Sequence, residues 1–321
     1  MTTTAERPSP RRRSASRSPW STVILFCSPF IVGLVVFQAY PIGAALYYSL
    51  TDYEAGSLLT PKFVGFANYV QALVNADDFW VGVRNTLWMV LIMVPLRTVW
   101  AVFVAWAINR VKRGARVYRT VMFLPSMVPV VGVALSFIVV LNPAGPLNAL
   151  LSRIGIDGPS WLGDPAWTKP SLVLMALWVA GDVVVIVGAA MLDVPADLYE
   201  AAELDGAGGW SRFWHVTLPG ISPVIYFSLI TGMIYTFQYF TEAFVVSGAT
   251  SNGATSTNAV LGYPHQSLLF YSTGIYQQGF SYFKTGYASA LAWMLFAVIL
   301  VATVVFIRVS RRWVSYGGGG R

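Results

Sequence analysis

This sequence has little charge. Asp, Glu, Lys and Arg make up 11% of its 321 residues, whereas about a quarter of a soluble globular protein is charged. Hydrophobic residues make up 56%, and the mean hydropathy is +0.60. The composition therefore excludes an ordinary water-soluble domain and predicts a chain that lies largely in lipid. The net charge of +7 does not point to nucleic acid, because the basic residues form short clusters between apolar runs.

Cysteine and histidine are scarcer still. The one cysteine, Cys27, cannot form a disulfide within the chain, and we expect it to pack within the first apolar run. His215 has no cysteine or second histidine near it, so we expect no metal site. The glycines of "GAGG" at 206–209 follow no strand and precede no Lys-Ser or Lys-Thr, so they form no phosphate-binding loop. We therefore expect no cofactor on this chain, and any nucleotide that powers it must bind to another chain.

Long apolar runs are what the sequence has instead. A membrane-spanning helix needs about 20 mostly apolar residues, and six stretches meet that length, which predicts an all-α membrane protein with six transmembrane helices. The predicted spans are 21–50, 81–108, 117–141, 170–192, 221–247 and 286–308. Residues 1–19, which are rich in Arg, Ser and Pro, are expected to be a disordered basic tail, and 311–321 a short C-terminal tail, on either side of a membrane domain at 20–310.

The basic residues predict an orientation. They concentrate before the first span, between the second and third spans, and after the last span, whereas the other connections hold few. Because cytoplasmic segments are enriched in Lys and Arg, both termini are predicted to be cytoplasmic. By parity, the connection 193–220 between the fourth and fifth spans is predicted to be cytoplasmic as well.

The connection 193–220 is expected to form two short helices. In "PADLYEAAEL", Asp197 is the expected N-cap, with Glu200 as its capping-box partner. Gly206, in "DGAGG", can take a positive φ and stop this helix.

The second of these helices, "WSRFWHVT", places Trp210, Phe213 and Trp214 on one face, and Leu218-Pro219 is expected to end it. The three aromatic side chains could contact a partner protein or anchor in the lipid headgroup layer. On spacing alone, the two helices could equally just cap a helix bundle.

The same connection carries a motif. Glu200-Ala201-Ala202, Gly206, Val216 and Leu218-Pro219 match, in type and spacing, the EAA signature of ABC importer permeases, with Val216 where isoleucine is usual. Other segments, among them "FVGFANYV" at 63–70 and "GYASALAWMLF" at 286–296, resemble the carbohydrate branch of that family, the maltose and glycerol-3-phosphate type. The resemblance covers about residues 20–310. It departs from the family at Ser136-Phe137, where a tryptophan is usual, and 250–285 is longer than in common members.

The resemblance implies a type I ABC importer permease in a bacterial plasma membrane. Its implied partners are ABC ATPase subunits that bind ATP and Mg, a second permease that is usually a different chain, and an extracytoplasmic solute-binding protein that delivers a carbohydrate. The chain itself would be a transport subunit without catalysis. The residues implied to couple to the ATPase are Glu200, Ala201, Ala202, Asp205, Gly206, Arg212, Leu218 and Pro219.

Charged residues inside the predicted spans form a second candidate site. Arg97 lies midway along the second span and Asp182 midway along the fourth. A charge at such depth costs several kcal/mol unless it is paired or hydrated, so we predict that these two residues form an ion pair. That pair could fix helix packing or take part in transport.

The fifth predicted span is rich in aromatic and hydrogen-bonding side chains. A sugar needs aromatic faces for its C–H surface and polar groups for its hydroxyls. Ordinary helix packing would explain the same composition. The residues that could line a translocation path are Tyr235, Gln238, Tyr239, Thr241 and Glu242.

Two other classes of protein stay open from the residues alone. A secondary transporter driven by an ion gradient usually carries more ionisable residues within its spans and has no need of the EAA spacing. An intramembrane enzyme would need a set of paired catalytic groups, whereas both histidines lie in connections.

Overall fold

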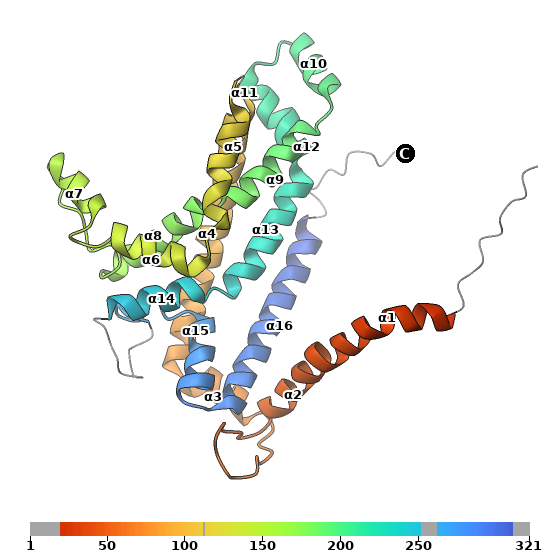
Figure 1. Ribbon diagram of the computed structural model, residues 1–321, viewed down its shortest axis with the longest axis vertical. Coiled ribbons are helices and arrows are strands. Elements are labelled where there is room, and N and C mark those ends of the chain that lie inside the picture. The colour runs from red at the N-terminus through yellow and green to blue at the C-terminus, as the bar shows by residue number, and fades with distance from the viewer. Residues whose placement is uncertain (1–19, 112, 252–261, 311–321) are drawn as a thin grey trace, which may run out of the picture. The chain divides into compact units, whose positions relative to one another are not determined.

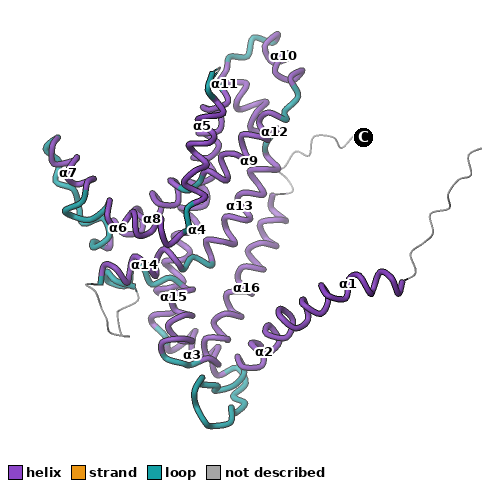
Figure 2. Tube along the Cα trace, in the orientation of Figure 1, coloured by secondary structure: helices purple, strands orange, loops and turns teal. Residues whose placement is uncertain are grey.

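The computed structural model describes residues 20–111, 113–251 and 262–310. Every regular element in these ranges is helical, and Figure 2 shows helices joined by loops. The chain divides after Tyr47 into two units. The predicted basic tails at 1–19 and 311–321 lie outside the described residues.

The first unit is one run of helix. It comprises α1 (Trp20–Leu34), the π turn η1 (Val35–Ala39) and α2 (Tyr40–Ser49), which continues into the second unit. Thr22–Ser49 is long and apolar enough to cross a membrane, as the sequence predicts for 21–50. Pro29 lies inside α1, where a span tolerates it if neighbouring groups satisfy the freed carbonyl.

The second unit is built around one long helix, α4 (Asp77–Asn109). Its 33 residues extend about 50 Å at the usual helical rise. Asp77 and Asp78 lie in its first turn, where negative charge suits the helix dipole. Residues all along α4 are buried, because α8 (Pro165–Trp178), α9 (Gly181–Leu192) and α13 (Ser222–Phe237) pack against it.

Different helices lie at the two ends of this unit. Figure 1 places α10 (Ala196–Leu204) and α11 (Gly209–Arg212) at one end, and α3 (Ala67–Asn75) at the other. Beyond α11 the chain continues through the π turn η3 (Phe213–Thr217) and α12 (Leu218–Gly220) into α13. The remaining elements are α5 (Ala115–Phe123), the 3₁₀ turn η2 (Leu124–Met127), α6 (Val130–Val140), α7 (Pro146–Arg153), α14 (Thr241–Thr250), α15 (Tyr271–Tyr276), the π turn η4 (Gln277–Ser281) and α16 (Thr285–Ser310).

Three of the predicted spans are not single helices. The third bends by 97° between Ala115–Met127 and Val130–Val140, and the fourth by 49° between α8 and α9. Pro129 explains the first break, because it lacks an N–H and disfavours helical backbone at Val128, which is extended here. Within the described residues, three helices are long and apolar enough to span a membrane, namely Thr22–Ser49, α4 and α16, or six spans if each bent pair counts as one.

The fifth predicted span, 221–247, is wrong as a continuous helix. Helix α13 ends at Phe237, and α14 starts at Thr241 after non-helical backbone at Phe240. The intervening Tyr239 turns inward, where it is 7% exposed and its ring lies 5.4 Å from that of Phe270. Tertiary packing of this one ring therefore accompanies the break that hydropathy did not reveal.

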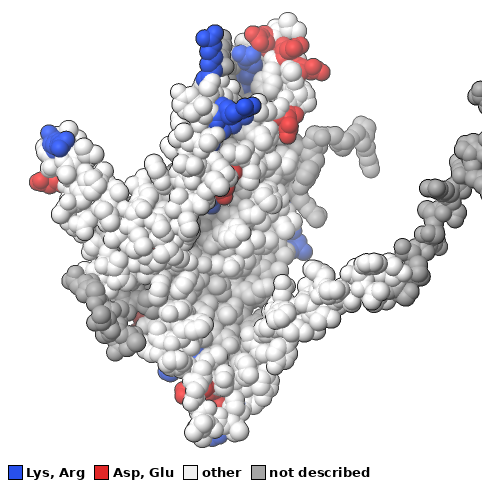
Figure 3. Space-filling view, viewed as in Figure 1, with Lys and Arg blue, Asp and Glu red and all other residues white. Residues whose placement is uncertain are grey.

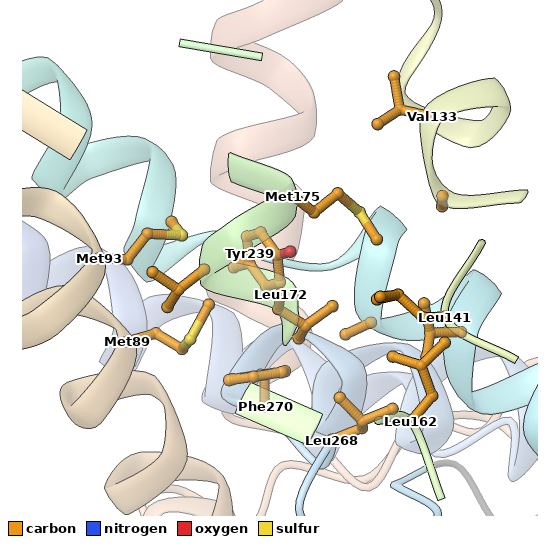
Figure 4. Packing of buried hydrophobic residues seen from close by; sticks show 14 residues of the cluster. Met89, Met93, Val133, Leu141, Leu162, Leu172, Met175, Tyr239, Leu268 and Phe270 are labelled. Carbon is orange, nitrogen blue, oxygen red and sulfur yellow. The ribbon is translucent and has the colours of Figure 1, made fainter. Parts of the chain in front are cut away.

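Two of the three buried apolar clusters in the described residues follow each other along α4. We call them the α14 core and the α9 core, after a helix that contributes to each. Figure 4 shows the α14 core, in which Tyr239 lies among methionine and leucine side chains. The α14 core comprises Met89, Met93, Val133, Ala134, Leu141, Leu162, Leu172, Val173, Met175, Tyr239, Ala243, Val246, Leu268 and Phe270. The α9 core comprises Ala101, Val102, Val104, Ala105, Ile108, Val184, Val187, Met191, Phe213 and Ile221.

Candidate functional site

The connection 193–220 forms the two helical pieces that the sequence predicts. The first, α10, starts at Ala196 with Pro195 in the N-cap position, and its N-cap makes no side-chain hydrogen bond. The predicted capping box of Asp197 and Glu200 is therefore wrong. Asp197 instead lies in the first helical turn, because Pro195 already fixes the extended backbone that precedes the helix.

The end of α10 agrees with the prediction. Gly206 has φ of +79°, a conformation that glycine adopts without a Cβ clash. The Ala207 N–H donates to the Ala202 carbonyl at 2.9 Å, and the Gly206 N–H donates to the Glu203 carbonyl at 3.0 Å. These two bonds form a Schellman motif, which closes the helix and turns the chain sharply.

Two polar contacts hold the helical pieces together. Arg212 Nη1 lies 2.8 Å from Glu203 Oε2, and the hydroxyls of Tyr199 and Thr217 lie 2.9 Å apart. The sequence did not single out these partners, because Tyr199 precedes the EAA signature and Glu203 and Thr217 fall at positions that the signature leaves variable. The opposite charges of Glu203 and Arg212 on either side of the glycine turn were the available signal.

The second helical piece runs further than predicted. Helix α11 passes into a π turn in which the Leu218 N–H bonds to the Phe213 carbonyl, and helical backbone continues to Gly220. The prediction that Leu218-Pro219 ends the helix is therefore wrong. The chain bends by 65° at Ile221, just before Pro223 in the first turn of α13, a position that suits proline.

The aromatic face of this piece is shared between the interior and the surface. Phe213 is buried, and its ring centroid lies 5.3 Å from that of Trp106 on α4. Trp210 and Trp214 stay 62% and 49% exposed. Of the three predicted contact residues, Phe213 therefore attaches the connection to α4, and only the two tryptophans remain open to a partner or a headgroup layer.

The signature residues lie mainly on the surface. Glu200, Ala201, Asp205, Gly206 and Pro219 are exposed. The other three predicted coupling residues, Ala202, Arg212 and Leu218, are half-buried. Figure 3 shows charged side chains gathered at the end of the unit that carries α10 and α11, with a largely uncharged face beyond it. The arrangement is an exposed acidic helix, α10, which starts three residues after α9 and is closed by the turn at Gly206.

The predicted ion pair is confirmed. Arg97 Nη2 lies 2.8 Å from Asp182 Oδ1, and the two side chains are 24% and 49% exposed. Arg97 Nε is buried and has no hydrogen-bond partner among the residues that the structure describes. Glu242 lines the same cavity as Arg97, a relationship that the sequence did not reveal.

These three ionisable side chains line one cavity of about 210 Å³. We call it the Arg97 cavity. The hydroxyl of Ser126 and the apolar side chains of Val133, Met175 and Val179 contribute to its walls. The cavity therefore offers hydrogen-bond donors, acceptors and apolar surface to a small polar molecule.

The predicted pathway residues do not share one helix face. Tyr235 and Gln238 are exposed at the end of α13, whereas Tyr239 is buried in the α14 core. Thr241 and Glu242 start α14, and of the five only Glu242 lines the Arg97 cavity. Across residues 20–111, 113–251 and 262–310, no three His, Cys, Asp or Glu side chains form a group that could hold a metal ion.

Comparison with known proteins identifies the class. The sequence matches the family described as "Binding-protein-dependent transport system inner membrane component" over residues 97–315. It is 34% identical over 293 residues to the probable ABC transporter permease protein YesP of Bacillus subtilis, covering 91% of each chain. It is 32% identical to the lactose transport system permease protein LacF of Rhizobium radiobacter, covering 88% of this chain and 91% of LacF.

A solved structure shares the fold. A chain of a bacterial alginate ABC transporter, crystallised with an alginate-bound periplasmic protein, aligns with a TM-score of 0.75 at 23% identity. The alignment covers 91% of this chain and 94% of the other. At that identity, the likeness establishes the fold alone.

The fold and the site define a helical, multi-pass membrane permease of a transport system. The chain belongs to the family of binding-protein-dependent transport system inner membrane components. It is an ABC importer permease, which excludes the ion-gradient-driven secondary transporter, and the family's role is transport.

Proposed function

We propose that this chain is the transmembrane subunit through which an ABC importer moves a carbohydrate. The observation that carries the proposal is the exposed EAA helix α10, which follows α9 after only three residues. Relatives named for lactose, arabinooligosaccharide and trehalose/maltose transport support a carbohydrate as the solute. We propose that an extracytoplasmic solute-binding protein delivers it, as a periplasmic protein accompanies the alginate transporter.

We further propose six spans with both termini in the cytoplasm of a bacterium, in the type I importer arrangement. The three long helices and three bent pairs supply six candidates. The excess of Lys and Arg before the first, between the second and third, and after the last supports the orientation. This orientation puts 193–220 on the side where ATP is available.

The proposed ATPase contact is the outer surface of 193–220. Glu200 and Asp205 offer exposed carboxylates for basic side chains of an ATPase subunit, and Ala201 allows close approach. The ion pair of Arg212 and Glu203 and the turn at Gly206 keep α10 rigid, so that a force on α10 reaches α9. ATP and Mg would bind to that partner, and a second permease chain, expected to be different, would complete the pore.

The proposed solute path passes the Arg97 cavity. Glu242, Asp182 and Arg97 supply acceptors and donors for hydroxyl groups, and the apolar wall suits the C–H face of a sugar ring. Gln238 and Tyr235 would contact the solute near the end of α13, where both are exposed. Thr241 adjoins Glu242, and the buried Tyr239 would support the path rather than contact the solute.

The test uses the complex of this chain, its partner permease and its ATPase subunits in liposomes. The sugar that most stabilises the purified solute-binding protein against heat is chosen as the probe. We expect uptake of that sugar to require ATP and the binding protein, and ATPase activity to rise when both binding protein and sugar are present. Uptake of a non-carbohydrate solute only, or uptake without ATP, would contradict the proposal.

A further inference from the structure

Three of the four spans that line the Arg97 cavity are broken there, whereas the second, α4, is a continuous helix. Helix α4 contains Pro95, two residues before Arg97, and proline removes one helical hydrogen bond. The third span breaks at Val128-Pro129 and the fourth at Val179-Ala180. The fifth breaks between Phe237 and Thr241. Non-helical backbone at membrane depth is tolerated only where protein buries it or a cavity hydrates it, so the coincidence of these breaks marks a functional level.

The same level separates the two apolar cores. Along α4, Met93 belongs to the α14 core and Ala101 to the α9 core, with Arg97 midway between them. Along the fourth span, Met175 and Val184 belong to the α14 core and the α9 core respectively, with Asp182 between them. At this level the α14 core and the α9 core are therefore two packed bodies joined by α4 and by the breaks in the third, fourth and fifth spans, an arrangement that allows a hinge.

The two carboxylates belong to opposite bodies. Asp182 is the second residue of α9, which packs against α5 and leads into α10. Glu242 is the second residue of α14, which packs against α6. Gly181 fixes the start of α9 to the third span, because a Cβ there would collide with the Met122 carbonyl. A displacement of α10 would therefore move Asp182 relative to Glu242.

One guanidinium shares the cavity with these two carboxylates. Arg97 makes a single bond to Asp182 and keeps a buried, unpartnered Nε, and Glu242 makes no ion pair within the described part of the chain. An unpaired charge at this cavity is costly. The conformation in which Arg97 pairs with Asp182 therefore competes with a conformation in which it pairs with Glu242. Such competition produces two discrete states rather than a continuum.

We propose that Arg97 exchanges carboxylate partners during the transport cycle, with Asp182 holding it in the conformation described here and Glu242 in the alternate one. Glu242 is then a positioning residue that stabilises the second access state. The proposal rests on the proposed function, because it needs an ATPase that displaces α10.

The test measures the balance of the two states in the assembled complex. A Cys27→Ser chain has no other cysteine, so Val139→Cys on α6 and Leu192→Cys on α9 can carry one spin label on each body. Both positions are exposed, at 65% and 61%. The distance between the labels is measured by pulsed electron paramagnetic resonance, without nucleotide and with ATP trapped by vanadate.

The proposed exchange predicts that Asp182→Asn and Glu242→Gln shift the population of the two states in opposite directions. Asp182→Asn leaves Arg97 only Glu242 and should shift the population about tenfold toward the alternate state, within the usual size of a conformational coupling. Glu242→Gln should shift it by a similar factor toward the described state. Asp157→Asn and Glu54→Gln make the same chemical changes on exposed connections and should shift nothing.

Shifts of the same sign in both variants, or a single unchanging distance in the wild-type complex, would overturn the exchange. If Asp182→Asn does not assemble, Glu242→Gln decides alone, because it keeps the observed ion pair; a population identical to that of the wild type then contradicts the proposal. Wild-type ATPase activity that responds to the binding protein and its sugar is measured on the same preparation. Its absence overturns the proposed function, whereas its presence with same-sign shifts overturns only the exchange.

Discussion

Two ion pairs of equal length lie in very different regions of this molecule. The N–O distance is 2.8 Å both between Arg97 and Asp182 and between Arg212 and Glu203. The first pair lies between two apolar cores, whereas the second joins short helices of an exposed connection, where Glu203 is 70% exposed. Because the attraction between charges depends on the surrounding dielectric, equal distance does not imply equal energy. The comparison indicates that the ion pair at the cavity stabilises the packing of the helices, whereas the pair in the connection contributes mainly to an exposed polar surface.

Removing Arg97 should have the largest effect on the stability of the protein. Arg97→Ala leaves Asp182 and Glu242 without a cation at the cavity, and a charge at membrane depth is costly unless it is paired or hydrated. We expect much less folded protein in the membrane and a lower thermal midpoint in detergent. The double variant Arg97→Ala/Asp182→Ala should recover part of both, because one unpaired carboxylate is removed with the cation. No recovery in the double variant would contradict an energetic role for the pair.

Gly181→Ala should have the second-largest effect on stability. The added Cβ would meet the backbone carbonyl of Met122, which cannot move like a side chain, so α9 must shift away from the third span. Forcing an extra methyl group into a packed contact costs about 1–3 kcal/mol. The thermal midpoint should fall, and solute uptake with it. Gly33→Ala is the matched control, since no atom lies within 4 Å of its added Cβ, and a comparable loss there would show that the contact does not matter.

The sequence predicts features that depend on local residue chemistry. It misses features that depend on packing between distant parts of the chain. Hydropathy indicated the apolar runs, and the need to neutralise buried charge indicated the bond between Arg97 and Asp182. The turn at Gly206 followed from a single residue type. The break around Tyr239 did not, because it depends on a ring that packs against Phe270 from a distant part of the chain. Glu242 starts the helix that follows this break, so its place at the Arg97 cavity did not follow from the sequence either.

Gly206→Ala tests the rigidity of the connection. At φ of +79° a side chain is strained, which costs about 1 kcal/mol. We expect little change in the thermal midpoint of the whole chain, because α10 lies at an exposed end, but a lower ratio of solute transported to ATP hydrolysed. Gly208→Ala, at an ordinary φ and with open space around its added Cβ, should keep that ratio. Equal ratios in both variants would show that the turn does not transmit force.

Glu203→Gln should have the smallest effect on stability and completes the comparison with the Arg97 pair. An exposed ion pair contributes about 0–1 kcal/mol, and salt screens it further. We therefore expect a thermal midpoint within a degree or two of the wild type, and a difference that disappears at high ionic strength. Asp182→Asn, measured in parallel, should lower the midpoint at every ionic strength, because its charge lies at a cavity between apolar cores rather than at an open surface. If both variants responded to salt alike, the two pairs would lie in similar dielectric surroundings, and the distinction between an architectural and a surface pair would be wrong.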